Sequence, residues 1–240
     1  PLCILEKDLE DRYVNDILNH SAVDVTTRQE TNKNGFCKMH FELLYSRQFN
    51  RLQLGLLLDT HLQVQNQSLL KTCRDAMEVF NDSQDEGNIL NRVLKNGVML
   101  KKSDTREIAS KLVSALRAQE AKCTLCKRIE HFMYRYTDII LLLWNREEEF
   151  RTLFCSKKGF CKKHFRYLLE IAAKSPPSKR NCEFVIKLLE MQCEHLERVE
   201  KEVHWFTEKF SYHNKDAPWG NSRDALLRGI QKVVGYCDLK

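Results

Sequence analysis

The segment GFCKMHFELL at residues 35–44 returns almost unchanged as GFCKKHFRYL at residues 159–168. Seven of the ten positions are identical, at an offset of 124 residues. A shorter match lies upstream of each copy, because Leu2-Cys3 corresponds to Leu125-Cys126 at an offset of 123. Self-similarity at a fixed period indicates repeated structural units. We therefore predict an N-terminal helical module at residues 1–100 and a C-terminal one at residues 101–240.

Apolar residues follow a helical period along most of the chain. They recur at steps of three and four between residues 129 and 144. A second series has a heptad-like seam made of Leu189, Cys193, Leu196, Val199, Val203, Phe206 and Phe210. Polar or proline-rich stretches at residues 81–88, 175–178 and 218–220 interrupt the pattern. These signals predict an all-α protein, a helical bundle of two modules in which each module is held together by a metal site.

The composition agrees with a folded helical protein. Hydrophobic residues make up 42% of the 240 positions and charged residues 30%, whereas glycine and proline number only 8 and 4. All-β folds and glycine-looped nucleotide folds need turn residues at short intervals, so this low count argues against both. No apolar run approaches the roughly 18 residues of a membrane span. The formal net charge of +6 allows a phosphate-rich partner without requiring one.

Four side chains of the C-terminal module have the spacing of a metal site. Cys123 and Cys126 form a Cys-x-x-Cys pair, and after 34 intervening residues Cys161 and His164 form a Cys-x-x-His pair. Residues three apart at a helix start point to the same side, so each pair makes a two-toothed clamp. Three thiolates and one imidazole suit tetrahedral zinc. We therefore expect these four residues to bind one metal ion.

Zinc in such a site has four protein ligands and no open position, so its expected role is structural. An iron–sulfur cluster stays an alternative, because thiolates also hold such clusters. A redox dithiol like that of thioredoxin needs a βαβ context, which a helical chain does not supply. Ten cysteines, several at metal spacings, favour a reducing compartment, and the expected location is the cytoplasm.

Other cysteines and aromatic residues have simpler interpretations. Cys73, Cys182 and Cys193 lie in helical patterns and are predicted to be small buried residues. Cys155, whose counterpart in the first copy is Thr31, is predicted to pack as well. The aromatic segment at residues 206–219 is predicted to form a lid over the helices, with a groove for a ligand or peptide as the alternative.

The doubled Cys-x-x-Cys and Gly-Phe-Cys-x-x-His pattern, with a closing PWG segment at residues 218–220, resembles an uncharacterised family of bacterial helical proteins. The resemblance covers essentially the whole chain. It implies a helical architecture and a bound metal, and it implies no reaction because the family has no established activity. Family members carry Cys-Pro-Leu-Cys near the N-terminus, where this sequence has PLC at residues 1–3.

The repeat also predicts how the site of the N-terminal module is completed. The offset of 123 maps Cys123 onto the position directly before Pro1. We therefore expect a cysteine at that position in the native protein. It would form a first metal site with Cys3, Cys37 and His40, which by themselves supply three ligands.

These features predict a metal-binding helical protein, most simply a binding or scaffolding module with structural zinc, and leave catalysis undecided. Its partner would be an unknown protein or a small ligand. One alternative is a redox protein or enzyme that uses an iron–sulfur cluster or a labile thiolate site. The other is a nucleic-acid-binding protein, given the net charge of +6 and the Lys and Arg residues near each metal pair.

Overall fold

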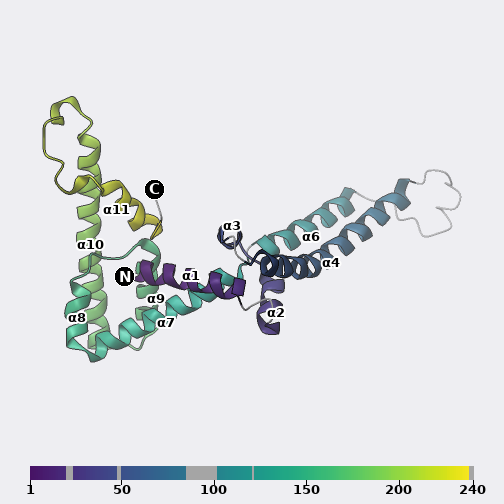
Figure 1. Cartoon of the computed structure of the whole chain (residues 1–240), viewed down its shortest axis with the longest axis horizontal. Coiled ribbons are helices and arrows are strands. Elements are labelled where there is room, and N and C mark those ends of the chain that lie inside the picture. Colours follow the sequence, from purple (N-terminus) through teal and green to yellow (C-terminus); the bar gives the residue numbers. More distant parts are fainter. Residues whose placement is uncertain (20–23, 48–49, 85–101, 121, 238–240) are drawn as a thin grey trace. The chain divides into compact units, whose positions relative to one another are not determined.

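The computed structural model describes residues 1–19, 24–47, 50–84, 102–120 and 122–237 (Figure 1). No β-strand occurs among these residues, so the predicted all-α class is confirmed. The α-helices are α1 (Leu2–Asn19), α2 (Val25–Asn34), α3 (Lys38–Ser46), α4 (Arg51–Gln84), α6 (Lys102–Glu120), α7 (Thr124–Arg146), α8 (Glu148–Cys155), α9 (Lys162–Lys174), α10 (Lys179–Glu208) and α11 (Ala225–Val234). Two short 3-10 helices, η1 (Tyr212–Asn214) and η2 (Gly220–Ser222), lie between α10 and α11.

The chain divides by its internal contacts into two compact units. Unit 1 consists of Pro1–Glu10 and Arg128–Lys240, and unit 2 consists of Asp11–Lys127. The boundaries fall within α1 and within α7. Unit 1 therefore takes its first residues from the N-terminal half of the sequence, and unit 2 takes its last residues from the C-terminal half. The two modules expected at residues 1–100 and 101–240 are defined by sequence similarity, and they stay a prediction.

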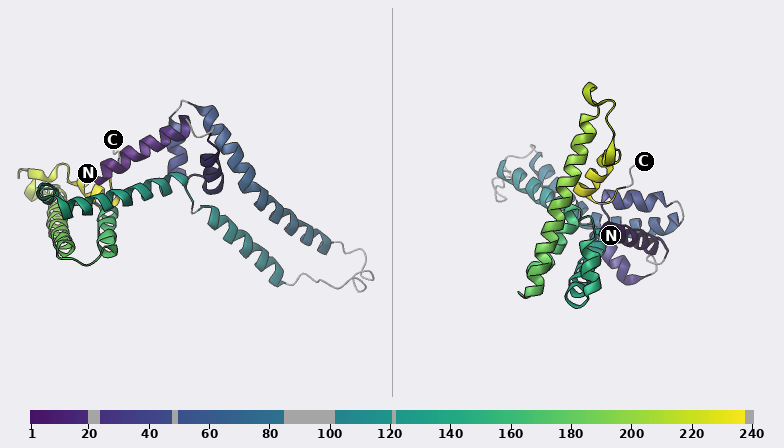
Figure 2. Two further views of the ribbon diagram at one scale, coloured as in Figure 1. Left: turned by 90° about the horizontal axis from the view of Figure 1, so that it is seen from below. Right: turned by 90° about the vertical axis from the view of Figure 1, so that its left-hand side faces the viewer.

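Unit 1 has an aromatic core beside α10. Trp144, Phe154 and Phe184 pack against one another with ring centroids 5.4–5.5 Å apart, and none is more than 4% exposed. Contacts of this kind stabilise beyond the area they bury. Ser178, after the two prolines, caps α10 by accepting a hydrogen bond from the N–H of Asn181 at 3.1 Å. Figures 1 and 2 both show α11 lying against α10.

Unit 2 has an aliphatic core that positions α3. Val14, Ile17 and Leu18 of α1, Leu44 of α3 and Leu57 of α4 are each at most 2% exposed. Burying such a side chain contributes roughly 1.5–3 kcal/mol relative to leaving it in water. The same unit contains α2 packed on α4, and α4 runs beside α6 as an antiparallel pair (Figure 2). The helix that bears Cys37 at its start is therefore held by apolar contacts from two other helices.

The long helix predicted near residues 189–210 is confirmed as α10, but the predicted seam coincides only in part with its buried face, since Val199 is its one buried member. Leu189 and Leu196 are 42% and 40% exposed, whereas Phe184, Leu188 and Met191 are buried. Apolar residues occur on more than one side of this helix, so periodicity alone selects no face. Contacts of α10 with α8, α9 and α11 make the selection.

Four local predictions were wrong. Cys182 and Cys193 are exposed because they lie off the buried stripe of α10, and Cys155 is exposed at the end of α8. Cys73 is partly buried. The polar segment at residues 81–88 is not all loop, because α4 continues through Gln84 and residues 85–88 lie outside the described ranges. Polar residues lower helix propensity only slightly, so an established helix extends through them.

The aromatic segment after α10 forms a cluster of its own. Phe206, Phe210 and Trp219 have ring centroids 5.4–6.3 Å apart, yet Phe210 and Tyr212 are 74% and 87% exposed. Neither residue is buried as a lid residue would be. The loop is organised from inside by Lys209, whose ammonium donates to three backbone carbonyls at 2.5–2.9 Å.

Candidate metal centres

The structure gathers all seven cysteine and histidine side chains singled out in the sequence, but in a different grouping. Cluster A consists of Cys37, His40, Cys123 and Cys126, and cluster B consists of Cys3, Cys161 and His164. Within each cluster the ligand atoms lie within 4.8 Å of one another. Cluster A lies wholly in unit 2 and cluster B wholly in unit 1.

This arrangement corrects the grouping inferred from the sequence. Cys161 and His164 do not join Cys123 and Cys126, and Cys3 does not join the pair of the first copy. Each Cys-x-x-His pair instead meets cysteine from the other copy. The physical reason is that a repeat makes same-copy and crossed pairings equally compatible with the local spacing, so only tertiary packing can choose between them.

In cluster A three sulfur atoms surround one ring nitrogen. Nδ1 of His40 lies 3.2 Å from Sγ of Cys37, 3.2 Å from Sγ of Cys123 and 3.3 Å from Sγ of Cys126. The sulfurs of Cys37 and Cys126 are 3.8 Å apart. A tetrahedral zinc ion with Zn–S bonds of about 2.3 Å separates its sulfur ligands by about 3.8 Å. The spacing fits ligands of one ion and far exceeds the ~2.05 Å of a disulfide bond.

Both Cys-x-x-His pairs start a helix in the same backbone conformation. Cys37 is the N-cap of α3 at φ −74° and ψ 166°, and Cys161 is the N-cap of α9 at φ −71° and ψ 162°. The glycine two residues earlier has a positive φ in each copy, 59° for Gly35 and 68° for Gly159. Side chains with a Cβ resist this conformation. The repeated motif therefore builds the same clamp twice.

A backbone hydrogen bond brings the Cys-x-x-Cys segment to the clamp of cluster A. The N–H of Thr124 donates to the carbonyl of Gly35 at 2.9 Å, and Thr124 is fully buried. The N–H of Cys126 then donates to Sγ of Cys123 at 3.5 Å. The cysteine pair thus lies at the N-terminus of α7, where the helix dipole favours negative charge.

In each cluster, a hydrogen bond between two of the cysteines shifts their pKa values in opposite directions. The hydrogen bond from Cys126 lowers the pKa of Cys123 to about 3. The hydrogen bond from Cys3 lowers the pKa of Cys161 to about 4. The same bonds raise the pKa of Cys126 and of Cys3. The thiolate is the form that binds metal, and these hydrogen bonds favour it at Cys123 and at Cys161.

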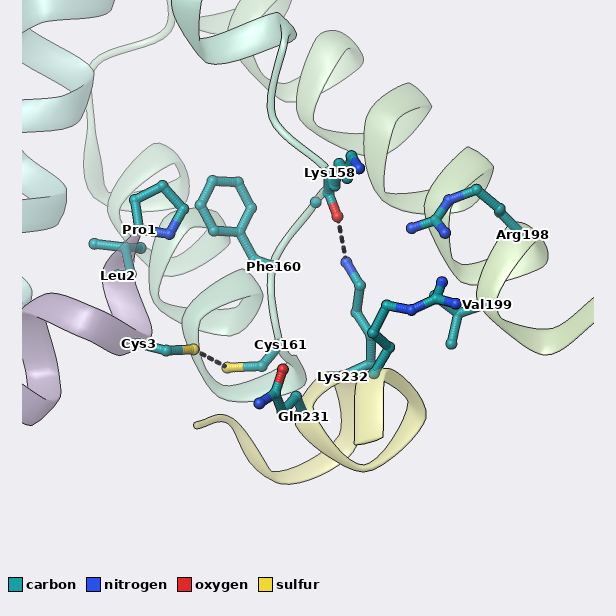
Figure 3. Close-up of a pocket in the computed structure, with 12 residues that line it drawn as sticks. Pro1, Leu2, Cys3, Lys158, Phe160, Cys161, Arg198, Val199, Gln231 and Lys232 are labelled. Atoms are coloured by element: carbon teal, nitrogen blue, oxygen red, sulfur yellow. Dashed lines mark hydrogen bonds between the residues drawn. The ribbon is translucent and has the colours of Figure 1, made fainter. Parts of the chain in front are cut away.

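Cluster B has the same geometry with three ligands among the residues described. Nδ1 of His164 lies 3.1 Å from Sγ of Cys161 and 3.3 Å from Sγ of Cys3, and the two sulfurs are 3.6 Å apart (Figure 3). His164 is fully buried.

A buried glutamine holds the loop that leads into cluster B. Oε1 of Gln192 accepts from the N–H of Phe160 at 2.9 Å, and its Nε2 donates to the carbonyl of Phe160 at 3.0 Å. Gln192 is 2% exposed. Both backbone groups of the residue before Cys161 are therefore fixed by one side chain of α10, and such support keeps a ligand in place.

Cluster B also has a carboxylate behind its histidine. Nε2 of His164 lies 3.3 Å from Oε2 of Glu6, and Nζ of Lys163 donates to Oε1 of the same carboxylate at 2.5 Å. Burial lowers the pKa of His164, but hydrogen bonds to Cys161 and Glu6 raise it overall. A carboxylate on the second ring nitrogen orients the imidazole and strengthens it as a metal ligand.

The sequence reasoning missed Glu6 and Gln192. For Glu6 a signal existed, because it follows Cys3 by three residues and so shares its face of α1. The same position after Cys126 is Ile129, so the repeat does not supply a second carboxylate there. No local signal marked Gln192, which lies 32 residues from its partner.

Glu6→Gln should weaken metal binding at cluster B by roughly 10-fold or more while leaving cluster A unchanged. The carboxylate lies 3.3 Å from Nε2 of His164 and offsets the charge of a cation bound by the imidazole, and a neutral amide cannot do this. Competition with a chromogenic chelator measures both affinities, and Glu10→Gln, four residues further along α1, serves as the matched control. Equal losses in the two variants would contradict the role assigned to Glu6.

Fold and site together define an all-helical protein with two Cys/His clusters that could each hold a metal ion. The chain belongs to a family of unknown function (DUF6062), whose signature matches residues 1–240. This confirms the resemblance noted from the doubled motif. No curated protein and no solved structure matches the chain. Within the described ranges, no helix combines the length and apolarity needed to cross a membrane.

Proposed function

We propose that this protein binds zinc at both clusters and that the zinc of cluster A is structural. The observation that carries the proposal is that cluster A combines three cysteines with one histidine, and that its four ligand atoms lie within 4.8 Å of one another. Four protein ligands leave no coordination position for a substrate water. The metal would lock the start of α7 to the start of α3, so that metal binding supplies folding free energy.

The sulfur spacing supports a single ion over the iron–sulfur alternative. In an iron–sulfur cluster the thiolates are distributed over several irons, which spreads them beyond the spacing of ligands on one ion. The separations of 3.8 Å between Cys37 and Cys126 and 3.6 Å between Cys3 and Cys161 match the edge of one tetrahedral zinc site.

A binding or scaffolding role for the whole protein is supported by its exposed apolar side chains. Leu52, Leu62 and Leu70 along α4 are 46–73% exposed. Large exposed apolar residues on a folded helix favour contact with a partner such as another protein. The nucleic-acid alternative draws less support, because Lys163 beside cluster B is paired with Glu6. All ten cysteines are unpaired, which supports a reducing compartment such as the cytoplasm.

Elemental analysis of protein purified without air tests the metal. We expect a colourless protein that contains zinc and lacks acid-labile sulfide. A brown protein with iron and sulfide would establish the redox alternative instead. Protein that is folded and free of any metal would overturn the proposal.

A further inference from the structure

Unit 1 contains a cavity of about 190 Å³ between the loop before α9, α10 and α11. Four basic residues line it, Lys158, Arg198, Arg228 and Lys232, and no acidic residue is among the described lining residues. Figure 3 shows Arg198 extending from α10 and Lys232 from α11 toward this space. Residues 1–3 also line the cavity, so four segments distant in sequence converge on it, and Cys3 and Cys161 of cluster B lie in its wall.

Carboxylates accept hydrogen bonds from only some of the N–H groups of the two arginines. Glu202 accepts from Arg198 at 2.8 Å and also from Arg228, and Asp224 accepts from Arg228 at 2.7 Å. Each guanidinium has five N–H donors. Nε of Arg228 is buried and has no hydrogen-bond partner within the described part of the chain. At least one N–H group of Arg228 is therefore left without an acceptor among the described residues at this edge of the cavity.

The two lysines add charge that no carboxylate of the lining balances. Nζ of Lys232 donates to the backbone carbonyl of Lys158 at 2.5 Å, which is a neutral acceptor. Burial, followed by the nearby Arg198, lowers the pKa of Lys232. An anion placed between the ammonium of Lys232 and the guanidinium of Arg198 would stabilise both positive charges, because the site is partly buried.

We propose that this cavity binds the phosphate group of a small phosphorylated molecule. A phosphate offers several acceptor oxygens to convergent donors, and arginine pairs with such oxygens in a bidentate manner. The volume has room for several water molecules and hence for one phosphate group. Lys158 and Lys232 are not metal ligands, whereas Cys3 and Cys161 of cluster B line another part of the same cavity.

Calorimetric titration of the full chain with inorganic phosphate, in about 0.15 M salt, tests this site. We expect saturable binding of one phosphate per chain. Lys232→Gln should weaken it at least 10-fold, and Lys158→Gln should weaken it about 3-fold or more without disturbing the fold, since the side chain of Lys158 is on the surface. Lys201→Gln, an exposed lysine on α10 outside the lining, is the matched control.

The other outcomes overturn the inference. Absence of saturable binding, or equal weakening in Lys201→Gln and Lys158→Gln, would show nonspecific attraction to a basic surface. Binding to phosphatidic acid vesicles without binding to inorganic phosphate would identify a membrane surface as the ligand instead. Metal content is measured in the same samples, because Cys3 and Cys161 belong to both features. Weaker phosphate binding in Lys158→Gln at unchanged metal content supports the cavity site, and metal-free protein that still binds phosphate counts against the proposed function alone.

Discussion

Cys126→Ser should remove the metal ion of cluster A and lower the melting temperature by roughly 6–12 °C. A loss of about 3 kcal/mol corresponds to this shift in a chain of this size, and a structural zinc site supplies more than that in smaller domains. Serine keeps the shape of the side chain but does not provide the soft thiolate that zinc prefers. Differential scanning calorimetry and metal analysis measure the two effects. Cys193→Ser, on the exposed side of α10, is the control and should change neither.

Double variants decide whether the two copies exchange their ligands. Cys126 and His40 share cluster A, so Cys126→Ser combined with His40→Ala should lose no more metal than either single change. Cys126→Ser combined with His164→Ala should lose both ions. Under a same-copy arrangement these two results would be reversed, and that outcome would refute the crossed clusters.

Cutting the folded chain between residues 85 and 101 should leave two fragments that stay together while metal is bound. Chelation of the metal should raise the dissociation constant of the two fragments at least 100-fold. Cluster A joins Cys37 to Cys123 and cluster B joins Cys3 to Cys161, so both ions bridge the cut. Metal ligation then becomes an interaction between fragments, and its removal deletes the strongest links. Size-exclusion chromatography of chain carrying an inserted protease site measures this.

The control for the cleavage experiment is the same chain with Cys126→Ser and His164→Ala. Its fragments should separate to the same degree with or without chelator, because neither cluster has its full set of ligands. If the unmodified fragments separate while their metal remains bound, each ion sits within one fragment. That result would restore the grouping inferred from the sequence alone.

The helices themselves were largely predictable, because their signals are local. Helix α10 begins directly after Ser178, which follows the proline pair. It ends at Glu208, before the break at residues 218–220. The sequence did not predict which face of a helix is buried. Leu189 and Leu196 fit the period as well as Leu188 does, yet only Leu188 is buried. Which apolar side faces inward depends on the neighbouring helix, and a helical period contains no information about that neighbour.

The identity of the clustered residues also came from the sequence. A glycine with positive φ, a cysteine at the helix N-cap and a histidine three residues later form a clamp that needs only about six residues of chain. The supporting residues were harder to find. Glu6 touches His164 from 158 positions away, and no spacing rule connects such partners.

The sequence by itself determined that this protein is helical, that it carries two equivalent clamps and which side chains can bind metal. The pairing of the clamps was decided only by the tertiary structure. A duplicated motif gives each Cys-x-x-His pair two sources of cysteine that local geometry cannot distinguish. The crossed pairing goes with long-range contacts between the copies, such as the bond from the N–H of Thr124 to the carbonyl of Gly35 and the approach of Glu6 to His164. These contacts exist only after the chain has folded, because they join residues that the sequence separates by 89 and 158 positions.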